Sequence, residues 1–141
     1  MASHSTTGTM AGRKINSMVA FVFGAVFVVV GLLGFTVSGG HHVAGTEGGD
    51  LLGLFQVNVL HNFVHLAAGA VLIGSAIAGA RAAKIANTLF GVVYLAVGVV
   101  GLLLVGTSAN IIALNGADNA LHLVLGAVLL GVGLGADRAR A

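Results

Sequence analysis

The sequence contains no cysteine, no proline and no tryptophan, and only 7% of its 141 residues are charged. Without cysteine, the chain has no disulfide framework, no thiolate metal site and no cysteine nucleophile. Metal chemistry would therefore rest on His, Asp, Glu or carbonyl ligands. Hydrophobic residues make up 57% of the chain, and the mean hydropathy is +1.07. These values lie outside the range of soluble globular domains and predict a membrane protein in contact with the lipid bilayer.

Four apolar stretches are long enough to cross a hydrocarbon core, which needs about 20 helical residues. The sequence therefore predicts an all-α integral membrane four-helix bundle built from two tandem transmembrane helical hairpins. One transmembrane domain covers residues 13–135, after a disordered cytoplasmic leader over residues 1–12 and before a cytoplasmic tail over residues 136–141. The expected spans are approximately Ile15–Val37, Leu60–Ala80, Ile85–Gly106 and Ala117–Gly135.

All six basic residues lie at one end of this arrangement, and three of the four acidic residues lie at the other. Because cytoplasmic segments carry the excess of Lys and Arg, both termini are expected in the cytoplasm. The net charge is only +2 and the basic residues occur in scattered pairs, so nucleic acid is not an expected partner. The basic residues are Arg13, Lys14, Arg81, Lys84, Arg138 and Arg140.

The chain also repeats itself. The stretch that begins at Phe23, FGAVFVVVGLLGF, matches FGVVYLAVGVVGLL from Phe90. The stretch that begins at Asn58, NVLHNFVHLAAGAVLIG, matches NGADNALHLVLGAVLLG from Asn115. Repeat one covers about residues 13–80 and repeat two about residues 84–135, and the first outer loop is the longer. Since both repeats have the same orientation, they predict a parallel pseudo-two-fold repeat, with stripes of glycine that let helices approach closely.

Each outside-starting helix carries a polar stripe on one face. Asn58 and Asn115 precede these helices and are expected to act as N-caps. Asp118 falls in the first turn, where a carboxylate is favourable, and His61 holds the equivalent place in repeat one. We expect the two stripes to face each other near the outer boundary. The stripes consist of Asn58, Asn62, His65 and Gly69, and of Asn115, Asn119, His122 and Gly126.

His65 and His122, with Asn62 and Asn119, are the deepest polar side chains, and an ionisable residue inside a span is a functional candidate. They could bind one another and hold the helices together. Three further hypotheses remain open: a metal site, a haem held by His65 and His122, and a pathway for a proton, an ion or a small solute. The cofactor is therefore unknown. The candidate metal ligands are His61, His65, His122 and Asp118, with His41, His42, Glu47 and Asp50 as further donors in the first outer loop.

Enzyme activity is not supported, because the sequence has neither a nucleophile with a positioned base nor paired carboxylates. The outer segment HHVAGTEGGD, from His41, is expected to be a mobile and exposed loop. The main hypothesis is a non-enzymatic structural, interaction or accessory-subunit protein, in a homo-oligomer or a complex with other membrane proteins. The alternatives are a metal-binding, haem-binding or solute-conducting protein, or an envelope stress factor that acts through the first outer loop.

Two motifs carry a family resemblance. LGLFQVNVLHNFVHLAAG, from Leu52, followed by NGADNALHLVLG, from Asn115, resembles domain-of-unknown-function family 4383 (DUF4383), over roughly Arg13 to Gly135. This family comprises small four-helix bacterial membrane proteins, found mainly in actinobacteria. The resemblance implies a multi-pass protein of the bacterial plasma membrane, and it implies no activity, cofactor or substrate.

Overall fold

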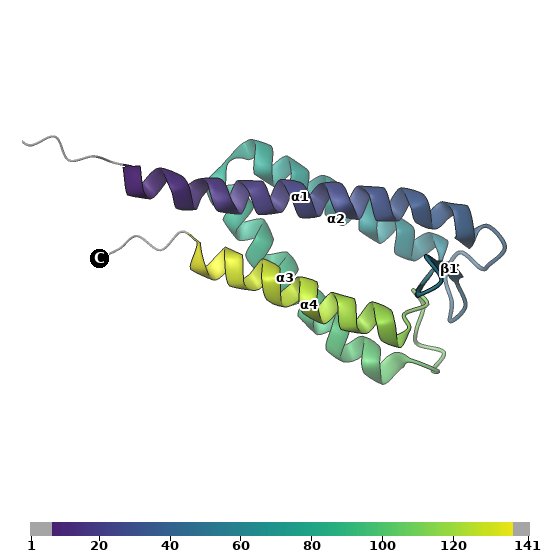
Figure 1. Ribbon diagram of the computed structural model, residues 1–141. Helices are drawn as coiled ribbons and strands as arrows, with labels where there is room; N and C mark the ends of the chain where they lie inside the picture. The colour runs from purple at the N-terminus through teal and green to yellow at the C-terminus, as the bar shows by residue number, and fades with distance from the viewer. Residues whose placement is uncertain (1–6, 137–141) are drawn as a thin grey trace, which may run out of the picture.

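Four helices account for most of the structure, a computed structural model that describes residues 7–136, with side chains from Ile15 onward. All four are long and apolar enough to cross a membrane, which supports a multi-pass membrane protein. They form the expected four-helix bundle, and the all-α prediction is confirmed (Figure 1). The helices are α1 (Thr7–Ser38), α2 (Val59–Ala78), α3 (Ala80–Leu104) and α4 (Gly116–Gly135).

The predicted segment boundaries differ from the structure mainly at two places. Helix α1 begins at Thr7, so residues 7–12 of the expected leader are helical, whereas residues 1–6 lie outside the described part of the chain. Helix α3 begins at Ala80 instead of Ile85, because a single residue, Gly79, makes the whole turn from α2. Gly79 has φ of 118°, a backbone conformation that favours glycine. Of the expected tail, residues 137–141 also lie outside the described part.

The helices pair as two antiparallel hairpins, α1 with α2 and α3 with α4. Glycines allow this close packing at equivalent points of both hairpins. A Cβ on Gly69 would lie 2.7 Å from the carbonyl oxygen of Gly24, and a Cβ on Gly126 would lie 2.9 Å from that of Gly91. Since real Cβ contacts are not this short, the predicted packing role of the glycines is confirmed.

The four helix ends that carry no outer loop lie together. The turn between α2 and α3 is at the same end of the bundle as the start of α1 and the end of α4 (Figure 1). Arg81 and Lys84 lie in the first turns of α3 and therefore at this end. The first outer loop (residues 39–58) and the second outer loop (residues 105–115) lie at the opposite end, which we call the outer end of the bundle (Figure 1).

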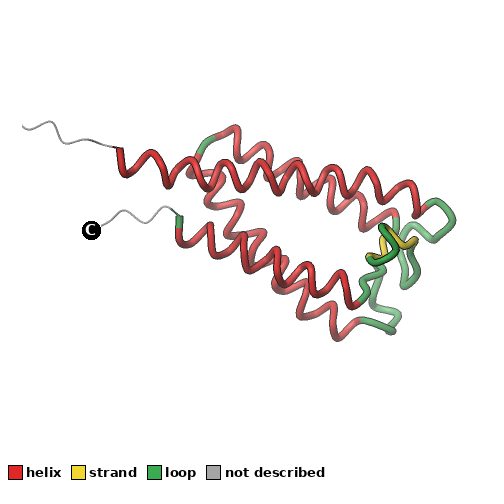
Figure 2. The backbone as a smooth tube through the Cα atoms, viewed as in Figure 1, coloured by secondary structure: helices red, strands yellow, loops and turns green. Residues whose placement is uncertain are grey.

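The first outer loop contains a small β-hairpin that the sequence analysis did not predict. Strand β1 (Gly49–Leu51) pairs antiparallel with β2 (Phe55–Val57) at the outer end (Figure 2). Leu52 and Gly53 form the turn with φ of 57° and 68°, as a type I′ turn requires. Strand β1 lies against α1, since a Cβ on Gly49 would overlap the backbone of Val37. The loop is thus docked on the bundle.

The two hairpins meet through α1 and α3. Phe27 of α1 and Tyr94 of α3 stack with ring centroids 5.0 Å apart, and both are buried. Farther toward the loop-free end, Asn87 Nδ2 donates to the carbonyl oxygen and to Oδ1 of Asn16 at 3.0 Å. Helices α2 and α4 meet at the outer end through side chains, since the ring centroids of His61 and His122 lie 5.9 Å apart.

Candidate functional site

Three buried histidines gather near the outer end of the bundle. His61 and His65 come from adjacent turns of α2, and His122 comes from α4. Their side chains are 2%, 8% and 5% exposed. The Nε2 atoms of His61 and His65 lie 3.2 Å apart, and one ring nitrogen from each of the three lies within 4.8 Å of the others. We call this group the histidine cluster.

Aromatic rings support the histidine cluster from both hairpins. The ring of His65 lies against Phe27, with centroids 5.5 Å apart, and the ring of His122 lies against Tyr94 at 5.1 Å. Because Phe27 and Tyr94 also stack on each other, four rings form a continuous row. The row fixes the positions of two imidazoles that belong to different hairpins.

The imidazoles line a cavity of about 80 Å³ between α2 and α3. The Nδ1 atoms of all three histidines are buried and make no hydrogen bond of standard geometry among the described residues. Backbone groups of Gln56 and Ile112 interact with His61, and that of Asp118 interacts with His122. The other lining residues are apolar or aromatic: Val64, Ala68, Phe90, Val93, Tyr94, Val97 and Ile112.

Asp118, the expected fourth metal ligand, lies apart from the histidine cluster. Its Oδ2 accepts hydrogen bonds from the backbone N–H groups of Asn115, at 3.0 Å, and Gln56, at 3.2 Å. Asn115 in turn accepts from the Asp118 N–H, which completes a capping box at the start of α4. The carboxylate therefore joins the first outer loop to α4.

The two N-cap asparagines also connect the hairpins. Asn58 accepts from the His61 N–H and donates to the carbonyl oxygen of Ile111 in the second outer loop at 2.9 Å. Asn115 donates to the carbonyl oxygen of Leu54 in the first outer loop at 2.9 Å. Each cap thus holds the outer loop of the other hairpin.

Asn62 and Asn119 pack within their own hairpins and do not meet at the histidine cluster. Asn62 Nδ2 donates to Ser38 Oγ at 3.0 Å. A Cβ on Gly34 would overlap Oδ1 of Asn62, and a Cβ on Gly101 would overlap Oδ1 of Asn119. The polar stripes therefore divide, with the histidines between the hairpins and the asparagines against glycines.

The further donors proposed in the first outer loop are exposed and outside the cluster: His41, His42, Glu47 and Asp50. Two backbone bonds anchor this loop, from Leu60 N to the Val43 carbonyl and from Gly45 N to the Ile111 carbonyl, both 2.8 Å long. The loop is exposed as expected, but it is attached to α2 and to the second outer loop.

Sequence reasoning missed the aromatic support of the site. Phe27 and Tyr94 hold the same register in the two matching stretches, FGAVF and FGVVY. An aromatic residue at equivalent positions of both repeats was the available signal. Reading it would have required knowing that α1 and α3 cross at this point.

A family model with the description "Domain of unknown function (DUF4383)" matches residues 17–135. The chain belongs to this family. The DUF4383 match starts within α1 and ends at the last residue of α4, so it covers the histidine cluster and both outer loops. No curated protein and no solved structure matches the chain. Because the DUF4383 description gives no activity, a functional argument must rest on the site itself.

Proposed function

We propose that this protein is a non-enzymatic component of the bacterial plasma membrane that binds a transition-metal ion through His61, His65 and His122. The observation that carries the proposal is the convergence of three buried imidazole nitrogens within 4.8 Å. Neutral imidazole suits zinc and copper among the common metals. The chain has no thiolate to offer, and Asp118 is engaged at the α4 cap.

The spacing of the nitrogens is close to what a metal requires. With bonds of about 2.0–2.1 Å in tetrahedral geometry, ligand nitrogens lie roughly 3.4 Å apart. The Nε2 atoms of His61 and His65, which hydrogen-bond to each other at 3.2 Å, are close to this spacing. His122 belongs to the other hairpin, so a small movement of its ring would complete a three-nitrogen site and tie the hairpins together.

The cavity favours a metal over the other hypotheses. A space of about 80 Å³ is too small for a porphyrin ring beside His65 and His122, although it can hold one small ligand. A solute or proton pathway would need polar groups along the bundle. In the described part of the bundle interior, apolar residues such as Ala20, Leu72 and Leu129 separate the cluster from the Asn16–Asn87 pair.

The same proposal includes an internal repeat, termini in the cytoplasm and a histidine cluster near the outer face of the membrane. Contacts at equivalent sequence positions, Phe27 with His65 and Tyr94 with His122, support an internal repeat related by a pseudo-two-fold axis. The basic residues at the loop-free end support cytoplasmic termini. The histidine cluster would then lie near the outer face, in an actinobacterial plasma membrane or a similar one, alone or as an accessory subunit of a larger complex.

Metal content tests the proposal directly. Purified protein is stripped with a chelator, reloaded separately with Zn²⁺ or Cu²⁺, freed of excess metal and subjected to elemental analysis. We expect about one ion per chain, and loss of that ion in His65→Ala and His122→Ala. The variant His41→Ala/His42→Ala is the control, because these histidines are exposed in the first outer loop. A native protein that retains neither metal, or one whose retention survives His65→Ala, would refute the proposal.

A further inference from the structure

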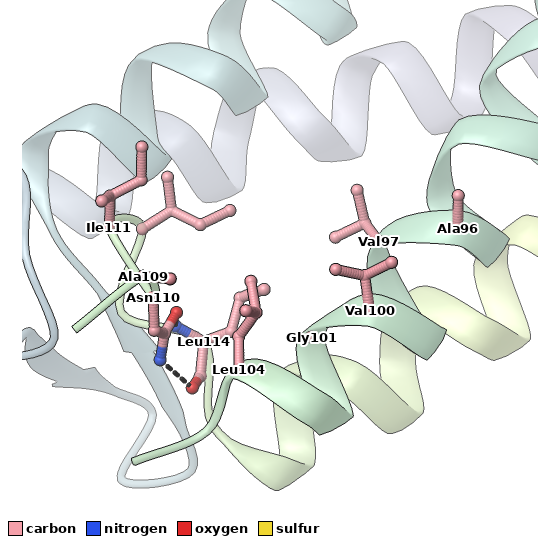
Figure 3. Close-up of a pocket in the computed structure, with 10 residues that line it drawn as sticks. Ala96, Val97, Val100, Gly101, Leu104, Ala109, Asn110, Ile111 and Leu114 are labelled. Atoms are coloured by element: carbon pink, nitrogen blue, oxygen red, sulfur yellow. Dashed lines mark hydrogen bonds between the residues drawn. The ribbon is translucent and has the colours of Figure 1, made fainter. Parts of the chain in front are cut away.

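A second and larger cavity, of about 440 Å³, adjoins the histidine cluster. It lies between the outer part of α3 and the second outer loop, and Val97 and Val100 face it from the helix while Ile111 faces it from the loop (Figure 3). This volume falls in the range of small-molecule sites, about 300–1,000 Å³. We call this cavity the α3 groove.

The α3 groove offers hydrocarbon contacts and almost nothing else. None of the described residues that line it is charged, and only Asn110 has a polar side chain. That side chain is already paired, because Nδ2 donates to the Leu114 carbonyl at 2.8 Å and Oδ1 accepts from the Leu114 N–H at 2.9 Å (Figure 3). The part of any ligand that fills the α3 groove must therefore be apolar.

The α3 groove borders the imidazole cavity. Val97 of α3 and Ile112 of the second outer loop line both spaces. At the far side of these two residues lie the imidazoles of the histidine cluster. A molecule that complements both spaces therefore has a long apolar part and a compact group that accepts or donates a hydrogen bond.

The corresponding face of α1 is covered. Val37 of α1 matches Leu104 of α3 in the two repeats. Strand β1 packs on α1 there, with Gly49 against the backbone of Val37. The second outer loop has no strand among its described residues, and Leu104 lines the α3 groove. The extra residues of the first loop thus fill on α1 a place that stays open on α3.

We propose that the α3 groove binds an isoprenoid quinone from the bilayer, with its chain in the groove and its ring at Val97 and Ile112, where one carbonyl oxygen faces the imidazole cavity. This inference rests on the proposed metal site, because the oxygen is placed at the coordination position that three imidazoles leave open. A quinone is uncharged and carries compact acceptors on an apolar body. A phospholipid head would bring a phosphate into a lining that has no cation to pair with it.

The chain carries its own optical probe for this site. Tyr94 is the single tyrosine and there is no tryptophan, and Tyr94 lines the imidazole cavity. Metal-loaded protein in phospholipid nanodiscs is titrated with a 1,4-naphthoquinone that bears a short isoprenoid chain. We expect saturable quenching of Tyr94 fluorescence at sub-stoichiometric quinone-to-lipid ratios, with no comparable effect of a fatty acid of similar length.

Two matched variants locate the binding site. Val100→Phe fills part of the α3 groove away from the imidazole cavity, whereas Val99→Phe adds the same ring to a similarly exposed position of α3 outside the groove. We expect Val100→Phe to weaken quinone binding at least tenfold while metal content is unchanged, and Val99→Phe to bind like the native protein. Equal binding by both variants, or equal quenching by the fatty acid, would overturn the inference.

The two proposals can fail separately. A metal-loaded protein that shows no saturable quenching would overturn the quinone site and leave the metal site standing. Quenching that is saturable and sensitive to Val100→Phe in a protein that retains no metal would uphold the α3 groove and refute the metal proposal.

Discussion

The outer ends of α2 and α4 follow one sequence pattern and differ at one decisive position. Each helix begins with an N-cap asparagine, and the third residue after the cap is His61 in α2 and Asp118 in α4. Asp118 turns back and accepts two backbone N–H groups. His61 turns inward and joins His65. The same backbone position thus serves loop attachment in one hairpin and the candidate site in the other.

Side-chain chemistry explains this divergence. A carboxylate is short and has several acceptor sites, so it can hold two N–H donors at a helix start. A neutral imidazole has a single acceptor nitrogen and a bulky ring, which suits a ligand position better than a capping box. At this position, hairpin two therefore attaches the first outer loop, and hairpin one supplies a second imidazole beside His65.

The largest loss of stability is expected from disrupting the close helix packing at glycine that both hairpins share. Gly24→Leu and Gly91→Leu place a side chain against the facing helix, at Gly69 and at Leu130. We expect the free energy of unfolding of each variant to fall by about 1–3 kcal/mol, as when a side chain is enlarged in a packed core. The measurement is the apparent melting temperature in detergent, followed by circular dichroism.

Matched controls for these variants exist in both hairpins. Gly74 and Gly131 hold equivalent positions, and an added Cβ would meet nothing within 4 Å at either. Gly74→Leu and Gly131→Leu should therefore melt within a few degrees of the native protein. Should Gly24→Leu be tolerated while Gly91→Leu is not, the hairpins would not be equivalent in packing.

A smaller and more selective effect is expected at the position where the hairpins differ. Asp118→Ala removes the acceptor of two backbone N–H groups, and we expect a loss of about 1–2 kcal/mol with full metal content. Asp118→Asn keeps one acceptor oxygen, so its stability should lie between that of the native protein and that of Asp118→Ala. His61→Ala should abolish retention of the metal while the capping box of α4 stays intact.

Metal content and the melting temperature of the metal-free protein are measured on the same preparations. Because residues 61 and 118 differ in role, we expect Asp118→Ala to lower the melting temperature and His61→Ala to lower the metal content. Loss of metal in Asp118→Ala without loss of fold would return Asp118 to the ligand set and contradict the division of roles.

Much of the architecture could be predicted because it depends on local pattern. Apolar run length gives the four helices, and the matched stretches identify the two hairpins. The single-residue turn at Gly79 escaped prediction, since no local pattern distinguishes a one-residue turn from a longer one. The β-hairpin escaped because its turn places Leu52 at positive φ, where Gly or Asn would be the expected signal.

The site was predictable only in part, because spacing on one helix does not reveal the partner helix. The i, i+4 spacing of His61 and His65 indicated a shared face, and the repeat indicated that His122 would be near. The direction of His61, and the separation of Asn62 and Asn119 from the histidines, depend on how α1 and α3 cross. At that crossing Phe27 stacks on Tyr94, a contact between the two repeats that the sequence of either repeat alone does not reveal.

The smallest expected effect concerns backbone strain, which each outer loop has at one described non-glycine residue. Leu52 has φ of 57° in the first loop and Ala113 has φ of 54° in the second. This conformation costs an L-residue roughly 1–2 kcal/mol. Leu52 is 82% exposed and makes a tight turn, so Leu52→Asn should raise stability by about 0.5–1 kcal/mol.

Ala113 is fully buried, which changes the balance in the second loop. Ala113→Gly relieves the same strain but removes a buried methyl group, worth about 0.8 kcal/mol. We therefore expect a net change near zero, against a clear gain for Leu52→Asn, in melting temperatures of the metal-free protein. The control is Leu54→Asn, an exposed position of the same turn without positive φ. A gain of equal size in Leu54→Asn would mean that surface polarity, and not backbone strain, separates the two loops.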